Sequence, residues 1–434
     1  MLENNGSGSD EKVDVLVAGG GLAGLTAANY LARAGYSVQL CEAAATPGGR
    51  ARTTVTEGFG FNMGPHALYR RGVGVQVLDE LGVSYTGGTP AAEGWLTRGG
   101  ERWPLPGSPL ALLTSRLLSL RERARALRFF GALARIDTDA LQTLSLDDWL
   151  ARQGMDGNLA SVIRTLVRLT AYCHDTASLP AGVALAQLRL GTGGVLYLDG
   201  GWQTLVAGLA DSAGRHGVRI RCKSPVRRVS GQPGALDVTL GDGRMIRARA
   251  VVLAVAPGVA LEILDGAAGD RLRRFAASAE PVQQACLDLG LATLPAPGRV
   301  FALGMDDPFY CSLHSASAEL APPGGHLFQL GRYGGDPDGH TRARLERWLD
   351  QLQPGWREHI LTSRYLRAAT VMNAMPSTAT GGLRGRPAPA DVGLPGVLLC
   401  GDWVGSCGIL SEASFASGRQ AAREGIMHLQ EAAA

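Results

Sequence analysis

A glycine-rich turn at residues 19–24, with the sequence GGGLAG, has the G-x-G-x-x-G spacing with which proteins hold a pyrophosphate. In this pattern Gly19 permits a tight turn, Gly21 lets the backbone approach the phosphates, and Gly24 allows a helix to pack closely on a strand. The N-terminus of that helix adds partial positive charge and free N–H donors. The spacing alone is a weak signal, so the residues around it decide the interpretation.

The segments on either side of this turn predict one strand–helix–strand unit. Residues 13–18 form a short apolar, β-branched run that is typical of a buried parallel strand. A helix is expected over residues 22–34, with Gly35 as its C-cap, and a second strand over residues 37–41. Glu42 ends the second strand, where a carboxylate can accept both ribose hydroxyls of an adenosine and repel a 2′-phosphate. Together these features predict an adenine dinucleotide and disfavour NADP.

A second glycine turn, PGGRAR at residues 47–52, carries two arginines. A nicotinamide dehydrogenase has no obvious need for it, whereas a longer, flavin-bearing dinucleotide does. Arg50 could neutralise the pyrophosphate while the glycines, Gly49 among them, let a ribityl chain pass. The alternative is an ordinary basic loop.

Buried, parallel-type strands recur at the start, middle and end of the chain. They are expected at residues 13–18, 250–256 and 397–400, with a mainly helical region over 104–187 and a last helix over about 411–428. Further strand-like segments fall at 218–222, 226–229, 236–240 and 245–248. The predicted fold class is α/β, with a Rossmann-like FAD-binding domain built from discontinuous segments and an interleaved α+β substrate-binding domain. The FAD-binding segments are 12–75, 195–260 and 366–434, and the substrate-binding segments, which include the helical region, are 76–194 and 261–365.

Composition narrows the classes of protein. A chain of 434 residues with 45% hydrophobic and 19% charged residues suits two or three globular domains. A net charge of +3 without basic, aromatic-rich runs indicates no nucleic-acid partner. Seven scattered cysteines without a C-x-x-C pair indicate no disulfide framework, no metal site and a cytoplasmic location. No apolar run is long enough for a transmembrane helix, and residues 1–11 are expected to form a disordered tail.

On these motifs the chain resembles the flavin amine oxidase, phytoene desaturase and protoporphyrinogen oxidase superfamily. Residues 13–52 resemble its FAD fingerprint, including the E-A-x-x-x-x-G-G-R arrangement that begins at Glu42, and FNMGPH at residues 61–66 resembles the loop laid against the isoalloxazine. Three further segments resemble family motifs: DGGW at 199–202 with Leu205, SPV at 224–226, and LCGDW with the following glycines and helix at 399–422.

The resemblance implies that FAD is the cofactor. It implies that Asp402 contacts the ribityl or pyrophosphate region, and that the N–H groups of Ile409 and Leu410 face the pyrimidine end, where a helix N-terminus stabilises the anionic reduced flavin. The expected FAD-binding residues are Gly19, Gly21, Leu22, Ala23, Gly24, Glu42, Ala43, Gly49, Arg50, Met63, Gly64, Pro65, His66, Val226, Gly401, Asp402, Ile409 and Leu410.

The residue types missing from the chain bear on its reaction. Many amine oxidases of the superfamily place a lysine near flavin N5, but the only lysines are Lys12 and Lys223, and neither is placed to reach it. Residues 371–376 hold no Trp or Tyr for an aromatic cage and no Cys for a thioether to the flavin. The FAD is therefore expected to be non-covalent. We expect a dehydrogenase or desaturase that passes a hydride from a C–H bond of an apolar or heterocyclic small molecule to flavin N5.

Candidate catalytic residues are His66 and Tyr69, while a structural role is favoured for His314 and for residues 172–175. Other functions stay open at this point. One is an amine or amino-acid oxidase that releases an imine and hydrogen peroxide. A second is a non-catalytic prenyl or lipid carrier of the same fold, and a third is redox-neutral isomerisation on reduced flavin. The sequence leaves the electron acceptor and the oligomeric state undetermined.

Residues 109–136 have the pattern of a basic amphipathic helix. Leu113, Leu117 and Leu120 begin an apolar series at helical spacing that Ala124, Leu127 and Ala134 continue, and Arg121, Arg125 and Arg128 lie on another face. A peripheral membrane contact would suit an apolar substrate. A helix packed on its domain with a solvated arginine face is the favoured interpretation.

Overall fold

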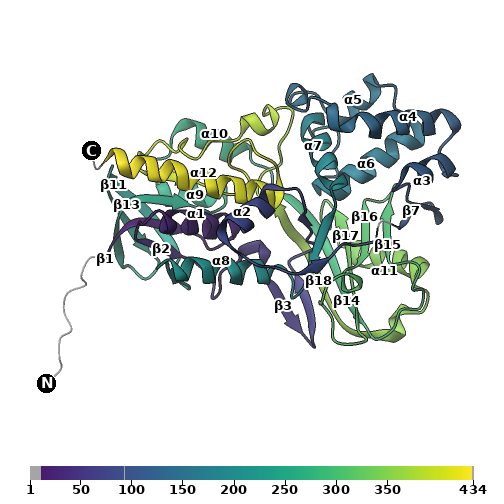
Figure 1. Cartoon of the computed structure of the whole chain (residues 1–434), viewed down its shortest axis with the longest axis horizontal. Helices are drawn as coiled ribbons and strands as arrows, with labels where there is room; N and C mark the ends of the chain where they lie inside the picture. The colour runs from purple at the N-terminus through teal and green to yellow at the C-terminus, as the bar shows by residue number, and fades with distance from the viewer. Residues whose placement is uncertain (1–10, 92, 433–434) are drawn as a thin grey trace.

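The computed structural model describes residues 11–91 and 93–432, which form two lobes, each built around a seven-stranded sheet (Figure 1). The predicted tail at residues 1–11 lies outside this range except for Glu11, which begins the first strand.

The first sheet contains β1 (Glu11–Ala18), β2 (Val38–Cys41), β10 (Arg219–Arg221), β11 (Val226–Gln232), β12 (Ala235–Leu240), β13 (Met245–Leu253) and β19 (Val397–Leu399). Its order is β10-β2-β1-β13-β12-β11, and β19 pairs with β13. The β1–β2, β1–β13, β2–β10 and β13–β19 pairs are parallel. Strands from the start, middle and end of the chain thus share one sheet, which confirms the predicted Rossmann-like arrangement of discontinuous segments.

One strand, β13, replaces two predicted strands. Its first half pairs antiparallel with β12 and its second half pairs parallel with β19, so that the chain continues straight from one partner to the other. It ends at Leu253, three residues earlier than predicted. Pro257 then begins helix α9 (Pro257–Leu264), where the missing N–H of proline breaks no helical hydrogen bond.

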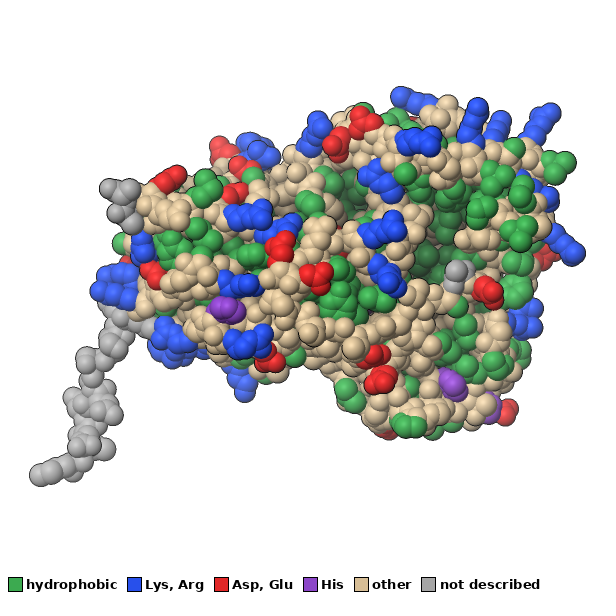
Figure 2. Space-filling view, in the orientation of Figure 1, with side chains coloured by type: hydrophobic (Ala, Val, Ile, Leu, Met, Phe, Trp, Pro, Cys, Tyr) green, Lys and Arg blue, Asp and Glu red, His purple; other side chains and the backbone are tan. Residues whose placement is uncertain are grey.

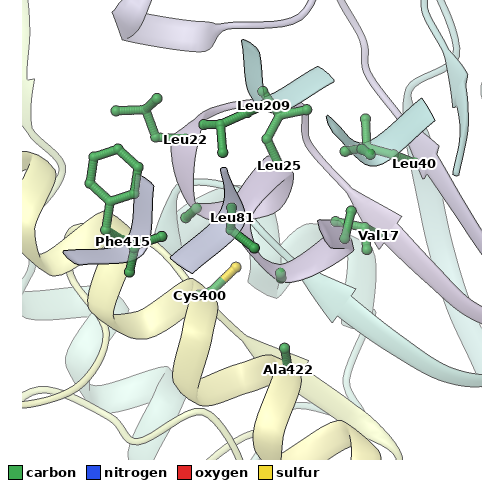
Figure 3. Close-up of a cluster of buried hydrophobic side chains, with 14 of the residues drawn as sticks. Val17, Leu22, Leu25, Leu40, Leu81, Leu209, Cys400, Phe415 and Ala422 are labelled. Carbon is green, nitrogen blue, oxygen red and sulfur yellow. The ribbon is translucent and has the colours of Figure 1, made fainter. Parts of the chain in front are cut away.

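The first lobe buries its main core between the sheet and four helices: α1 (Leu22–Arg33), α2 (Val73–Leu81), α8 (Gln203–Arg215) and α12 (Leu410–Glu431). Figure 3 shows this cluster, with Val17 and Leu40 from strands, Leu25 from α1, Leu209 from α8 and Phe415 from α12, all of them buried. The predicted helices over 22–34 and 411–428 are confirmed within three residues at each end.

Helices α1 and α12 pack unusually close together. A Cβ placed on Gly418 of α12 would stand 2.5 Å from the carbonyl oxygen of Ala23 in α1, so no larger residue fits there without moving a helix. Glycine therefore fixes the spacing between the two helices, and with it the spacing between their N-terminal residues, Leu22 and Leu410.

The packing near two of the predicted domain boundaries favours other positions for them. Val77 and Leu78 of α2 lie in the core of the first lobe, although the predicted substrate domain begins at residue 76. Ile263 of α9 and Leu272 of α10 (Asp270–Ser278) pack on the other face of the first sheet, although the second substrate segment was expected from residue 261. We therefore propose boundaries at about residues 83 and 279.

The second sheet has the order β18-β14-β17-β16-β15-β7-β8. Its strands are β7 (Trp95–Arg98), β8 (Glu101–Pro104), β14 (Val282–Leu291), β15 (Phe301–Gly304), β16 (Phe309–Leu313), β17 (His326–Tyr333) and β18 (Ile360–Met372). Helix α11 (Thr341–Leu352) covers one face through Leu345 and Leu349. Small sheets join the lobes: β3 (Thr53–Thr56) with β4 (Phe59–Asn62), and β9 (Val195–Leu198) between β5 (Leu68–Tyr69) and β6 (Gly87–Gly88).

The predicted helical region is confirmed as α3 (Pro109–Thr114), α4 (Leu120–Ala132), α5 (Leu146–Arg152), α6 (Gly157–Ala171) and α7 (Ala181–Thr192). The single helix expected over residues 109–136 is wrong, because the chain breaks after Thr114 and restarts at Leu120. Ser119 and Glu122 form a capping box that satisfies the backbone N–H groups at the new helix start. In residues 11–91 and 93–432, no helix has the length and apolar character needed to cross a bilayer.

Candidate flavin and substrate site

A cavity of about 710 Å³ lies between the lobes, within the size range of small-molecule and cofactor sites. All the residues expected at the site line this cavity except two, Gly24 and Ile409. Residues 18–19, 21–23, 41–43 and 401–402 bring the carboxyl-terminal ends of β1, β2 and β19 to its wall, as the binding edge of a parallel sheet should.

The three glycines of the G-x-G-x-x-G turn differ in the space around them. A Cβ on Gly19, whose φ is +107°, would stand 2.5 Å from Ala254 O, and one on Gly24 would stand 2.0 Å from Gly19 O. A Cβ on Gly21 meets no atom within 4 Å. Gly19 and Gly24 therefore shape the turn and the helix packing, while Gly21 leaves open space at the cavity, as passage of a pyrophosphate requires.

Glu42 is held in place by backbone donors. Its Oε2 accepts from the N–H of Gly20 at 2.7 Å, and its Oε1 accepts from the N–H of Ala44 at 2.7 Å. The carbonyl oxygen of Glu42 accepts from the N–H of Ser224, which ties Glu42 to the start of β11 and to Val226. The carboxylate and Val226 thus border one end of the cavity together, at the place expected for ribose and adenine.

Arg50 and Asp402 form an ion pair across 352 residues of sequence, with 2.8 Å between Nη1 and Oδ2. Asp402 also accepts from the backbone N–H and the side-chain amide of Asn373, at 2.9 and 2.8 Å. Burial acts to raise the pKa of Asp402, but the charge of Arg50 and these hydrogen bonds outweigh it and hold the pKa below its usual value. The pair is therefore ionised at neutral pH and orients Arg50 at the cavity wall.

The start of α12 contributes one strained residue. Leu410 lines the cavity with a φ of +58°, a left-handed conformation that bulky residues rarely adopt. Ile409, in contrast, is 1% exposed and packs in the core of the second lobe. The structure therefore brings only Leu410 of this predicted pair to the cavity.

His66 lies in the loop of residues 62–66 that crosses the cavity wall. Its Nδ1 lies 2.7 Å from Gly64 O, and its ring packs against that of Trp202 with 4.8 Å between centroids and an angle of 58° between the ring planes. Burial lowers the pKa of His66 to about 4, and the nearby charges of Arg50 and Arg364 act in the same direction. His66 is thus neutral at pH 7.

Two tyrosines border the cavity, and their hydroxyls donate hydrogen bonds to backbone carbonyls. Tyr69 donates to Thr170 O at 2.8 Å, and Tyr172 donates to Pro65 O at 3.0 Å. Both line the cavity. Tyr172 was assigned a structural role from the sequence; it reaches the wall because α6 ends there, with Tyr172 as its left-handed cap. No spacing signal pointed to it.

The second sheet supplies wall residues that the sequence did not predict. Gln284 and Cys286 of β14 and Thr370 of β18 line the cavity. Burial, with the charge of Asp288, raises the pKa of the Cys286 thiol well above its usual value, so the thiol is protonated and a poor nucleophile. Strand alternation alone could not say which face of these strands meets a cavity.

His314 lies away from this wall. It is 1% exposed, stacks on Tyr197 with 3.9 Å between centroids, and its Nε2 lies 2.9 Å from the hydroxyl of Tyr310. Burial lowers its pKa to about 3. Neither Lys12 nor Lys223 lines the cavity, and residues 11–91 and 93–432 contain no cluster of three or more metal-ligating side chains.

Charge is unevenly distributed along the cavity. The charged lining residues, Glu42, Arg50, Arg52, Arg227, Glu262 and Asp402, all come from the first lobe, whose glycine turns and strand ends form what we call the dinucleotide end. The loop of residues 63–69, the end of α6 and strands β14 and β18 form what we call the substrate end, and they contribute Met63, Pro65, His66, Tyr69, Tyr172, Gln284, Cys286, Ala369 and Thr370 to the lining. Open space at a glycine turn, a carboxylate at the ribose position and an arginine beside it fit the adenine, ribose and phosphates of FAD. The uncharged remainder fits a flavin ring and an organic substrate.

Comparison with known proteins agrees with a cavity that fits FAD. A family model described as flavin-containing amine oxidoreductase matches residues 22–425. Hydroxyneurosporene desaturase of Cereibacter sphaeroides is 30% identical over 296 residues, 59% of this chain and 58% of that protein, so the chain spans less than two thirds of that relative's length.

Solved structures share the fold. An oxidoreductase from Methanosarcina mazei matches with a TM-score of 0.76 and 19% identity over 94% of this chain and 98% of that one. Putrescine oxidase bound to putrescine matches with a TM-score of 0.73 and 17% identity over 96% and 99%. At these identities the likeness concerns the fold alone.

Proposed function

Because the chain belongs to the flavin-containing amine oxidoreductase family, we propose that it is a dehydrogenase or desaturase acting on an uncharged, apolar or heterocyclic small molecule. FAD is its cofactor and, when bound, supplies a hydride acceptor at N5. The observation that carries the proposal is the absence of any charged side chain from the lining of the substrate end, among the residues that the structure describes. A charged substrate would find no counter-ion on the elements that form this end, and its burial against them would cost several kcal/mol.

The chain's own residues bind and orient the substrate. Because the hydroxyls of Tyr69 and Tyr172 donate to backbone carbonyls, the two residues offer ring faces and edges to a ligand. The low pKa of His66 keeps its ring uncharged. The wall therefore selects by shape and apolar contact and keeps water away from the reacting C–H bond.

The lining of the substrate end also bears on the alternative functions. An amino-acid oxidase would need a cation for the substrate carboxylate, and none lines the substrate end within the described chain. An amine oxidase remains the second candidate, since the family model carries that chemistry in its description. The carrier interpretation is dropped, because the family is one of oxidoreductases.

Anaerobic mixing tests the proposal directly. The FAD-loaded protein is mixed with separate polyenes, porphyrinogens, heterocyclic intermediates, amines and amino acids, and flavin absorbance is followed. We expect bleaching by a neutral polyene or heterocycle. Bleaching by amines or amino acids alone, with hydrogen peroxide formed on admitting air, would overturn the proposal.

We further infer that the FAD is held without a covalent bond. The cavity-lining thiol nearest the flavin loop is that of Cys286, and its raised pKa keeps it protonated. Acid precipitation should release all the flavin into the supernatant. Yellow colour retained in the washed pellet would contradict this.

A lipid surface is the partner that we propose for α3 and α4. Leu110, Leu113 and Leu120 are 71%, 51% and 78% exposed. Residues 109–135 contain six arginines and one acidic residue, Glu122. Figure 2 shows hydrophobic side chains gathered over this part of the second lobe, with basic side chains around them. Exposed leucines framed by cations suit an anionic bilayer surface.

A further inference from the structure

Arg364 of β18 holds a fully buried carboxylate in the second lobe. Its Nε and Nη2 donate to Oδ2 of Asp288, at 2.9 and 2.6 Å. The other carboxylate oxygen, Oδ1, accepts from Gln329 at 3.3 Å. Asp288 is 0% exposed, and burial outweighs these partners and raises its pKa to about 6. A buried pair of this kind adds little net stability, so its presence calls for another explanation.

The same guanidinium reaches into the first lobe. Its Nη1 donates to Thr54 Oγ1 at 3.2 Å and to Phe61 O at 3.3 Å, and its Nη2 donates to Asn62 O. The guanidinium carbon also lies 5.1 Å from the centre of the Phe61 ring. One side chain therefore ties the second sheet to the β3–β4 hairpin, with partners about 300 residues away in sequence.

Asn62 is the residue from which the flavin loop starts. Its carbonyl oxygen accepts from Gly64 N–H at 2.8 Å, and its Oδ1 accepts from Trp202 N–H at 3.0 Å and from the Thr53 hydroxyl at 2.6 Å. A Cβ on Gly64, whose φ is +102°, would lie 3.4 Å from Cys286 Sγ on β14. The loop thus lies against the sheet that carries Arg364 and Asp288.

We propose that Arg364 is a positioning residue that sets the separation between the loop of residues 62–66 and β14, and so the width of the substrate end of the cavity. Arg364 itself does not line the cavity. It acts through Asn62, whose loop carries cavity-lining residues such as Gly64 and His66. The inference rests on the proposed function only in treating this end as the place of the substrate.

The test compares Arg364→Met and Arg364→Lys with Arg342→Met, which removes an exposed pair with Glu346 on α11 of the same lobe. On the FAD-loaded proteins, acrylamide quenching of flavin fluorescence reports access to the cavity without any substrate. The substrate concentration that half-saturates anaerobic flavin reduction reports the fit. We expect Arg364→Met to raise the quenching constant severalfold and the half-saturating concentration about tenfold, with FAD content unchanged. In Arg364→Lys the quenching constant and the half-saturating concentration should both rise less than in Arg364→Met. Arg342→Met should behave like the wild type.

A lower melting temperature with unchanged quenching and unchanged half-saturation would overturn the proposal and leave Arg364 a purely structural residue. Loss of FAD in a folded Arg364→Met protein would overturn it as well, because the effect is expected at the substrate end. If that variant fails to fold, Arg364→Lys takes its place: it must raise the quenching constant above that of the wild type, and Asp288→Asn, which keeps the loop contacts of Arg364, must raise it less than Arg364→Lys does. Since quenching needs no substrate, the inference can succeed even if no neutral molecule is oxidised.

Discussion

The two ends of the cavity are built by different means. At the dinucleotide end, open backbone at Gly21, a backbone-anchored carboxylate at Glu42 and the Arg50–Asp402 pair provide donors and charges. At the substrate end, Tyr69 and Tyr172 have their hydroxyls satisfied by the protein and present rings. On our proposal, the first end recognises charged and hydrogen-bonding groups, and the second recognises mainly shape.

This difference separates what the family shares from what distinguishes its members. The dinucleotide end faces the same ligand in every FAD enzyme, so its chemistry is constrained. The substrate end is formed where two lobes meet, and a small change in packing there changes its shape. Substitutions at the two ends should therefore have separable effects, from loss of the cofactor to changes in substrate fit.

The largest effect is expected at Gly21. Gly21→Val places two methyl groups in the space left for the pyrophosphate, so the protein should fold and be purified free of flavin. Gly24→Val is the matched contrast, because its Cβ would overlap Gly19 O and should reduce soluble, folded protein. Absorbance at the flavin maximum and circular dichroism distinguish the two. A stable yellow Gly21→Val protein would contradict the assignment.

Glu42→Ala should weaken FAD retention by about 1.5–3 kcal/mol, through loss of charge-assisted hydrogen bonds to the ribose. Titration of the apoprotein with FAD measures this, and Glu42→Gln, which can still accept hydrogen bonds, should lose less. Equal affinity in the wild type and Glu42→Ala would count against a ribose contact.

At the substrate end, Tyr172→Leu should leave FAD content unchanged and raise the half-saturating concentration of the reducing substrate about tenfold, the equivalent of ~1.4 kcal/mol. Tyr172→Phe keeps the ring and removes only the hydrogen bond to Pro65 O, so a smaller change is expected. Loss of flavin in Tyr172→Leu would show that the two ends are not separable.

Acid should act on His314 and on Asp402 in different pH ranges. The folded pKa of His314, lowered by burial to about 3, means that the unfolded chain binds the proton first, so unfolding free energy falls as pH drops below about 6.5. Asp402 has a lowered pKa, so its contribution persists until pH falls below about 4. The free energy of unfolding, measured with a denaturant at pH 7 and at pH 5, should therefore differ less between the two pH values in His314→Phe than in the wild type. An identical pH dependence in both would contradict a buried, neutral His314.

The smallest effect is expected on the exposed face of α3 and α4. Replacing Leu110, Leu113 and Leu120 with serine should lower co-sedimentation with phosphatidylglycerol vesicles while leaving FAD content and melting temperature unchanged. Phosphatidylcholine vesicles are the control for charge. Equal sedimentation of wild type and variant would remove the lipid surface as a partner.

Some of what the sequence did not predict was nevertheless encoded locally. The break between α3 and α4 is marked by Ser119 and Glu122, a capping box three residues apart. The periodic leucines on either side predict one continuous helix, and periodicity alone takes no account of the cap. The capping box prevails because it satisfies backbone donors, whereas Leu113 and Leu120 stay 51% and 78% exposed in the folded chain.

The sequence by itself determined the dinucleotide end, because a glycine turn, a strand-ending carboxylate and a Gly-Asp pair act through backbone geometry that short spacings encode. Only the tertiary structure decided the substrate end. Tyr172, Gln284, Cys286 and Arg364 come from a helix end and the face of a sheet, and which side of each element meets the cavity depends on how the lobes pack. Side-chain direction at such a junction is a property of the whole fold and not of any one segment.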